Sequence, residues 1–243
     1  GSTLDLDQLL DICRPFVVWA VDWYNSRPTL DLTTIIAEAG GPDKIAILAV
    51  DVTVGFCSKG ALASDRVAGI VEPISTLFKR AHDLGVRHFV LPQDTHIEGA
   101  IEFSAFPPHC VAGTDESTTM PELLALPFSD LFTVIEKNSV CVSLGTDLDP
   151  WLEAHPEVTT FVTVGDCTDF CTHRLAMHLR LRANVLHQPN ARVILPVDGV
   201  DTFHIPVDVA RELNIMPHHG DLLHLIFLFN MAQNGVEVVA KVA

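Results

Sequence analysis

A cysteine stands at the junction of an apolar run and an amphipathic segment in residues 159–182, TTFVTVGDCTDFCTHRLAMHLRLR. The β-branched run at 160–164 predicts a strand that stops at Gly165, and leucines at helical spacing predict a helix that begins at Cys171. A helix start offers free backbone N–H groups and a positive dipole end, which can lower a thiol pKa and stabilise an oxyanion. Cys171 is therefore the candidate nucleophile, and the alternative is an inert buried cysteine.

Reactive side chains also follow other apolar runs, which lie at residues 44–50, 87–91 and 132–135. The residues after these runs are Asp51, then Asp94 and His96, then Lys137. In an open parallel sheet, ligands bind outside the carboxyl ends of the strands, so we expect these side chains and Cys171 to share one pocket. A thiol that attacks a carbonyl needs a nearby base and a cation, and Asp51 with Lys137 is the available pair.

The segment after the second of these runs contains residues that suit a divalent transition ion such as zinc, iron or manganese. Asp94 and His96 are two positions apart, so on a strand they point to the same side, and His109 follows across a loop. Pairs of this kind also occur in loops that bind no metal. The metal site is therefore a prediction with an open alternative.

The elements that position these residues alternate between strands and helices. Further helices are expected at 65–84, 147–154, 208–213 and 221–233, and further strands at 193–197 and 236–242. This order predicts an α/β fold, a doubly wound, mostly parallel sheet with helices on both faces in a Rossmann-type three-layer arrangement. We assign residues 44–243 to this domain. Residues 1–43 form an N-terminal helical extension, with one helix or two over residues 4–24, interrupted at Pro15.

Composition narrows the class of protein. With 15 Lys+Arg against 31 Asp+Glu and a net charge of −16, the chain lacks a basic stripe, which argues against nucleic acid or an anionic membrane as partner. No apolar run approaches the roughly 20 residues of a transmembrane helix. The six cysteines are irregularly spaced and are expected to be reduced thiols, which favours the cytoplasm. A small-molecule substrate and a homo-oligomer are expected.

The order and spacing of these motifs resemble the isochorismatase-like cysteine hydrolases and, among them, the nicotinamidases. The resemblance runs from about residue 44 to the C-terminus. Its motifs are D-x-x-x-x-F at 51–56, D-x-H at 94–96, F-P-x-H-C-V at 106–111, the isolated Lys137, and T-D-F-C at 168–171.

The resemblance implies a role for each matching residue. Asp51 takes the thiol proton of Cys171 and passes it to the leaving amine, while Lys137 tunes both groups. The backbone N–H groups of Cys167 and Cys171 hold the oxyanion, and a cis peptide bond is expected between Asp166 and Cys167.

It also implies a divalent ion, most readily zinc, beside the catalytic groups, where the ion binds a ring nitrogen of the substrate and orients the carboxamide. The ligands are Asp94, His96, His109 and a fourth residue, for which Glu102 matches best and Glu98 is the rival. Phe56, Phe106 and Phe170 are expected to wall the pocket for a flat ring.

The sequence thus predicts a metal-dependent cysteine amidohydrolase that converts nicotinamide to nicotinate and ammonia through a thioester acyl-enzyme, as in pyridine nucleotide salvage. Two alternatives stay open, a related amidohydrolase of another small amide, such as an N-carbamoyl compound, and a non-catalytic binding protein with the same fold. The complete set of Asp51, Lys137 and Cys171 argues against the second alternative, and the metal-type cluster argues against the first. The presence of Cys171 disfavours an isochorismatase proper.

Overall fold

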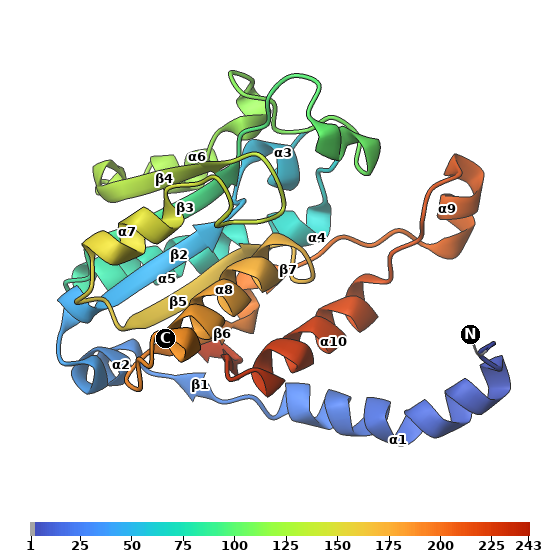
Figure 1. Cartoon of the computed structure of the whole chain (residues 1–243), viewed down its shortest axis with the longest axis horizontal. Helices are drawn as coiled ribbons and strands as arrows, with labels where there is room; N and C mark the ends of the chain where they lie inside the picture. The colour runs from blue at the N-terminus through green and yellow to red at the C-terminus, as the bar shows by residue number, and fades with distance from the viewer. Residues whose placement is uncertain (1–2) are drawn as a thin grey trace.

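A parallel sheet of seven strands forms the centre of the computed structural model, which describes residues 3–243 (Figure 1). The strands follow the order β4-β3-β2-β5-β6-β8, and β7 pairs with β5. Their bounds are β2 Ile45–Val50, β3 His88–Asp94, β4 Phe132–Lys137, β5 Thr160–Asp166, β6 Arg192–Pro196, β7 Val200–Asp201 and β8 Glu237–Val239. All pairings in this sheet are parallel, which confirms the predicted fold class.

Helices cover both faces of the sheet because the side chains of the central strands are apolar on both sides. β2 is buried along its whole length, and its odd-numbered and even-numbered side chains enter different cores. One core includes side chains of α2 (Leu32–Ala39), α5 (Val71–Asp83) and α6 (Pro121–Leu124). The other includes side chains of α7 (Leu148–Ala154), α8 (Cys171–Val185) and α10 (Gly220–Gln233).

Two expected elements are divided in the structure. The helix expected over 65–84 is interrupted after α4 (Asp65–Ala68), because the N–H groups of Gly69 and Ile70 bond the carbonyl oxygens three residues earlier, those of Arg66 and Val67, which tightens the chain into a 3-10 turn there. The strand expected over 236–242 is divided into β8 and β9 (Lys241–Val242), and β9 pairs with β1 (Thr29–Leu30) outside the main sheet.

The long stretch between β3 and β4 contains several short elements. Besides α6, these are the 3-10 helices Ile101–Ser104, Asp115–Ser117 and Ser129–Leu131, and similar turns occur at Pro42–Lys44 and Val197–Gly199. The short helix α3 (Val54–Cys57) follows β2. α3 and the 3-10 helices at Ile101–Ser104 and Val197–Gly199 follow strands and lie by their carboxyl ends, where the predicted site residues lie, whereas Pro42–Lys44 and Ser129–Leu131 directly precede β2 and β4.

The N-terminal segment is one continuous helix, α1 (Leu6–Asn25), with Pro15 inside it. Its second half packs on α10, where the rings of Phe16, Trp19 and Trp23 surround Phe229 at centroid distances of 5.1, 5.6 and 6.0 Å. Within residues 3–243, no helix combines the length and apolar character that crossing a membrane requires.

Candidate active site

The predicted site residues follow strands that are neighbours in the sheet. β4, β3, β2 and β5 lie side by side, and Asp94 at the end of β3 pairs with Lys137 at the end of β4. Gly165 is required where β5 meets β2, because its φ is 122° and a Cβ would lie 2.1 Å from the carbonyl oxygen of Val50. Because of this close approach, the residues that follow β2 lie next to the residues that follow β5.

Lys137 is the centre of a buried polar cluster. Its Nζ lies 2.9 Å from Oδ2 of Asp51 and donates hydrogen bonds to Oδ1 of Asp94 and, over 3.3 Å, to Sγ of Cys171. Oδ1 of Asp51 accepts the backbone N–H of Asp94 at 2.7 Å. The side chains of Lys137 and Asp51 have no exposed surface. The structure thus brings together the base, cation and thiol expected from the sequence.

The electrostatics of this cluster decide where its protons lie. Burial, reinforced by Asp94, raises the pKa of Asp51 to about 6, so its carboxyl is ionised at neutral pH. Burial alone would lower the pKa of Lys137, but Asp51 and the other acidic groups hold that pKa well above its usual value. Burial raises the pKa of Cys171 well above the usual value despite Lys137, so the expectation of a lowered thiol pKa is wrong. The resting cluster is a carboxylate, an ammonium and a neutral thiol.

Two backbone N–H groups are available beside the thiol. The peptide bond between Asp166 and Cys167 is cis, as the resemblance implied. Cys171 is the first residue of α8, where backbone N–H groups have no partner within the helix. Neither the N–H of Cys167 nor that of Cys171 donates a hydrogen bond to any group in the described part of the chain. Both are therefore free to hydrogen-bond an oxygen atom next to Sγ.

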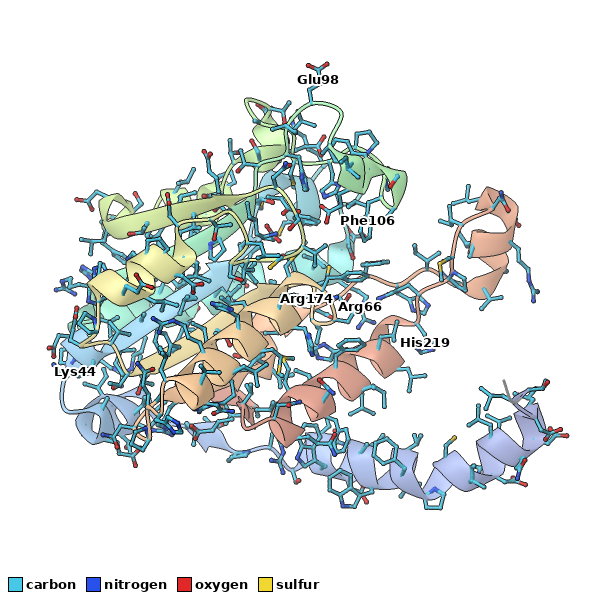
Figure 2. All side chains as sticks on the ribbon, viewed as in Figure 1. Lys44, Arg66, Glu98, Phe106, Arg174 and His219 are labelled. Carbon is cyan, nitrogen blue, oxygen red and sulfur yellow. The ribbon has the colours of Figure 1, made fainter. Side chains whose placement is uncertain are left out.

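The predicted metal ligands form a compact group next to this cluster. Ligand atoms of Asp94, His96, Glu102 and His109 all lie within 4.8 Å of one another. Nε2 of His96 lies 3.1 Å from Nε2 of His109 and 3.2 Å from Oε2 of Glu102, and each Nε2 lies 3.3 Å from Oδ2 of Asp94. Glu98, the rival ligand, is exposed and points outward (Figure 2).

The hydrogen bonds of the two imidazoles indicate that this group suits a cation. Nδ1 of His109 faces the carbonyl oxygen of Pro107 at 2.8 Å, and Nδ1 of His96 faces Oδ1 of Asn138 at 3.0 Å. That amide oxygen also accepts the N–H of Ile97, which fixes its orientation. Each Nδ1 therefore carries a proton, and in the neutral imidazoles each Nε2 presents a lone pair to the other and to carboxylate oxygens. Burial alone would lower the pKa of His96, but Asp94 raises it, which indicates that this group favours a positive charge at Nε2, either a proton or a metal ion.

Cys171 of the catalytic cluster and the candidate ligands Asp94, Glu102 and His109 line one cavity of about 530 Å³. Its lining includes Cys171 and His109 together with the expected aromatic residues Phe56, Phe106 and Phe170. The ring of Phe106 lies 5.7 Å from that of Phe170 in an edge-on arrangement. A cavity with aromatic walls and polar groups at its base suits a small flat molecule.

Several residues of this region were not predicted as site residues. Asn138 orients His96, and the only sequence clue was its place directly after Lys137. Phe203 lines the cavity and stacks on His218 with ring centroids 3.8 Å apart. His218 is buried, and its Nε2 lies 2.6 Å from Oδ2 of Asp169, so it fixes the cavity wall.

The parallel sheet and the cysteine at the strand-to-helix turn define an isochorismatase-like hydrolase. The isochorismatase domain profile matches residues 45–220, so the chain belongs to this family, as the resemblance predicted. The chain is 27% identical over 216 residues to nicotinamidase 1 of Arabidopsis thaliana, covering 82% of this chain and 86% of that protein.

Two further similarities agree with this membership. The nicotinamidase/pyrazinamidase of Mycobacterium tuberculosis is 31% identical over 147 residues, covering 54% of this chain and 76% of that protein. The crystal structure of the pyrazinamidase of Pyrococcus horikoshii in complex with zinc has a TM-score of 0.60 at 22% identity, covering 81% of this chain and 98% of that one. That similarity concerns the fold alone.

Proposed function

We propose that this protein hydrolyses nicotinamide to nicotinate and ammonia, with Cys171 as nucleophile, Asp51 as base and Lys137 as the cation between them. The observation that carries the proposal is the position of Lys137 Nζ, 2.9 Å from Oδ2 of Asp51 and 3.3 Å from Sγ of Cys171, which lines the aromatic cavity. The identities of the relatives from Arabidopsis thaliana and Mycobacterium tuberculosis support nicotinamide as the substrate.

The protonation states lead to a simple sequence of steps. Asp51 takes the proton of the neutral thiol as Sγ attacks the carboxamide carbon, since a thiol with a raised pKa needs a base at that moment. The free N–H groups of Cys167 and Cys171 hydrogen-bond the oxyanion. Asp51 then returns the proton to the leaving nitrogen, ammonia departs, and a thioester remains on Cys171. Water that gives a proton to Asp51 attacks the thioester, which yields the carboxylate product and the free thiol.

The proposal includes a divalent ion, with zinc as the first candidate. Its ligands are Asp94, His96, Glu102 and His109, whose two facing lone pairs and two carboxylates form a set that suits such an ion. When bound, the ion supplies a Lewis acid that holds the ring nitrogen of the substrate. Glu102 is positioned for this role because its Oε1 accepts the backbone N–H of Val140 at 2.9 Å.

The state of the thiols supports a location for the protein. All six cysteines are unpaired, and several are buried, including the proposed nucleophile. A free nucleophilic thiol is best maintained in a reducing compartment. We therefore include the cytoplasm in the proposal.

The test is release of ammonia from a panel of small amides. The protein is supplied with zinc, iron(II) or manganese(II), or is stripped with a chelator, and is offered nicotinamide, pyrazinamide, benzamide and an N-carbamoyl amino acid. We expect nicotinamide to give the highest kcat/KM, benzamide to react poorly because it lacks the ring nitrogen, and Cys171→Ala to be inactive. A higher kcat/KM for the N-carbamoyl compound would assign the chain to the related amidohydrolases instead. Substantial turnover by Cys171→Ala would refute the assigned nucleophile.

A further inference from the structure

The first half of α1 carries apolar side chains that nothing in the described chain covers. Leu9 and Ile12 precede Phe16, Trp19 and Trp23 at spacings of three and four residues, the pattern of a helix that packs along its length on another helix. Phe16, Trp19 and Trp23 pack around Phe229 of α10. Leu9 and Ile12 are 38% and 67% exposed, because α1 extends beyond the end of α10 (Figure 1).

Every described residue before Cys13 is exposed, although residues from Leu6 onward are helical. These first turns of the 20-residue helix gain no packing from the described chain, although most helical stability in proteins comes from tertiary packing of an apolar face. Leu6 and Leu10 add further exposed apolar surface on the neighbouring side of the helix. The helical face therefore lacks a partner along its first turns.

A second apolar element projects from the same side of the molecule. The segment that carries α9 (Val207–Leu213) leaves the domain after Phe203 and returns at His219, and its base is closed by two backbone hydrogen bonds between Ile205 and His218 (Figures 1 and 2). We call residues 206–217 the α9 arm. Within it, exposed apolar side chains are Val207, Val209, Leu213, Ile215 and Met216, while Ala210 is buried.

The exposed area of these two elements is large for a monomer. With side chains of about 150–200 Å² each, the exposed fractions of the apolar residues on α1 and the α9 arm amount to on the order of 1,000 Å² per chain. The largest apolar patch of a typical monomer is about 300–600 Å², whereas each partner in a standard interface contributes about 800 Å². The area is therefore sufficient for a stable dimer.

We propose that a second copy of this chain covers the first half of α1 and the α9 arm in a two-fold symmetric dimer. In such a dimer the same two elements meet their counterparts, so one contact surface serves both copies. A lipid surface fits less well, because the polar face of α1 carries Asp7, Asp11 and Asp22 against a single Arg14 and would be repelled by anionic headgroups.

The test is the mass of the full chain in solution, measured by light scattering after size-exclusion chromatography over a wide range of concentrations. We expect the wild type at twice the chain mass of 26.5 kDa. The double variants Leu9→Glu/Ile12→Glu and Leu213→Glu/Met216→Glu should each run at the monomer mass and retain the far-UV circular dichroism of the folded domain. Val185→Glu, at a 76% exposed apolar residue at the end of α8, is the matched control and should remain dimeric.

Three outcomes would overturn the proposal. The first is a wild type that stays at the monomer mass at every concentration, which would leave the surface to a different partner. The second is a dimer that persists in either double variant, which would place the interface elsewhere. The third is a monomeric wild type that floats with vesicles of phosphatidylcholine and phosphatidylglycerol and loses this binding in Leu9→Glu/Ile12→Glu.

Discussion

Replacing Lys137 with methionine is expected to destabilise the folded protein strongly at alkaline pH. The Lys137 side chain is fully buried, and its ammonium compensates two carboxylates, those of Asp51 and Asp94, whose side chains are 0% and 3% exposed. Removing one partner of a buried ion pair leaves an uncompensated charge and costs about 3–5 kcal/mol. Because two carboxylates lose their partner here, we expect the upper part of this range, a large share of the roughly 5–15 kcal/mol that stabilises a typical domain.

The same reasoning fixes how the loss depends on pH. The pKa of Asp51 is already raised to about 6, and without the ammonium it rises further, so the folded variant binds a proton that the unfolded chain does not. A group whose folded pKa is raised stabilises the fold more as the pH falls. The difference between Lys137→Met and wild type should therefore shrink as the pH is lowered from about 8 to about 5.5.

The assay is urea unfolding followed by far-UV circular dichroism, in the presence of a chelator so that no ion compensates Asp94. Lys59→Met is the matched control, since Lys59 pairs with Asp115 at 2.6 Å on the surface, where the side chains are 55% and 77% exposed. Such a pair contributes about 0–1 kcal/mol. A loss in Lys137→Met no larger than in the control, or one that does not change with pH, would refute the charge assignment of the buried cluster.

Three further predictions concern the proposed chemistry. Cys171→Ser should lower kcat by at least about 10³-fold, since a hydroxyl is much harder to ionise than a thiol, while Cys141→Ser keeps the wild-type rate of ammonia release. Because the pKa of Asp51 is about 6 and the base must be ionised, kcat/KM should be level above that pH and fall about tenfold per unit below it, and a profile without this acid limb would exclude Asp51 as the base. His109→Ala should lose metal in elemental analysis after dialysis, whereas Glu98→Gln retains it, and equal metal content in both would exclude the ligand cluster.

The sequence predicted the arrangement of the site because parallel strands align their carboxyl ends. Asp51 directly follows an apolar run, Asp94 and Lys137 come three and two residues after theirs, and adjacency of those runs in the sheet brings the side chains into contact. Alternate residues of an extended chain point to the same side, and this rule predicted that Asp94 and His96 lie together. The fold class followed from the regular alternation of strands and helices, and the structure confirms it.

Other features depend on tertiary contacts that a local pattern does not contain. The helix start at Cys171 predicted a lowered thiol pKa, but burial outweighs the ammonium of Lys137 and raises the pKa. The divided strand at the C-terminus depends on β1, about 200 residues earlier in the chain, which pairs with β9. Asn138 and Phe203 carry no motif of their own, and only the packed structure shows that one orients His96 and the other lines the cavity.

The two halves of the site are joined through Asp94. One of its carboxylate oxygens accepts a hydrogen bond from Lys137, and the other lies 3.3 Å from Nε2 of both His96 and His109. The ionised carboxylates of Asp51 and Asp94 outnumber the single ammonium of Lys137, so these three buried groups have a net formal charge of −1, which a bound cation would offset. Transfer of the thiol proton from Cys171 to Asp51 does not change the net charge of the site. The thiolate therefore forms without adding charge to a buried region that water cannot solvate. This balance explains why the same buried region contains both a raised thiol pKa and a set of ligands for a dication.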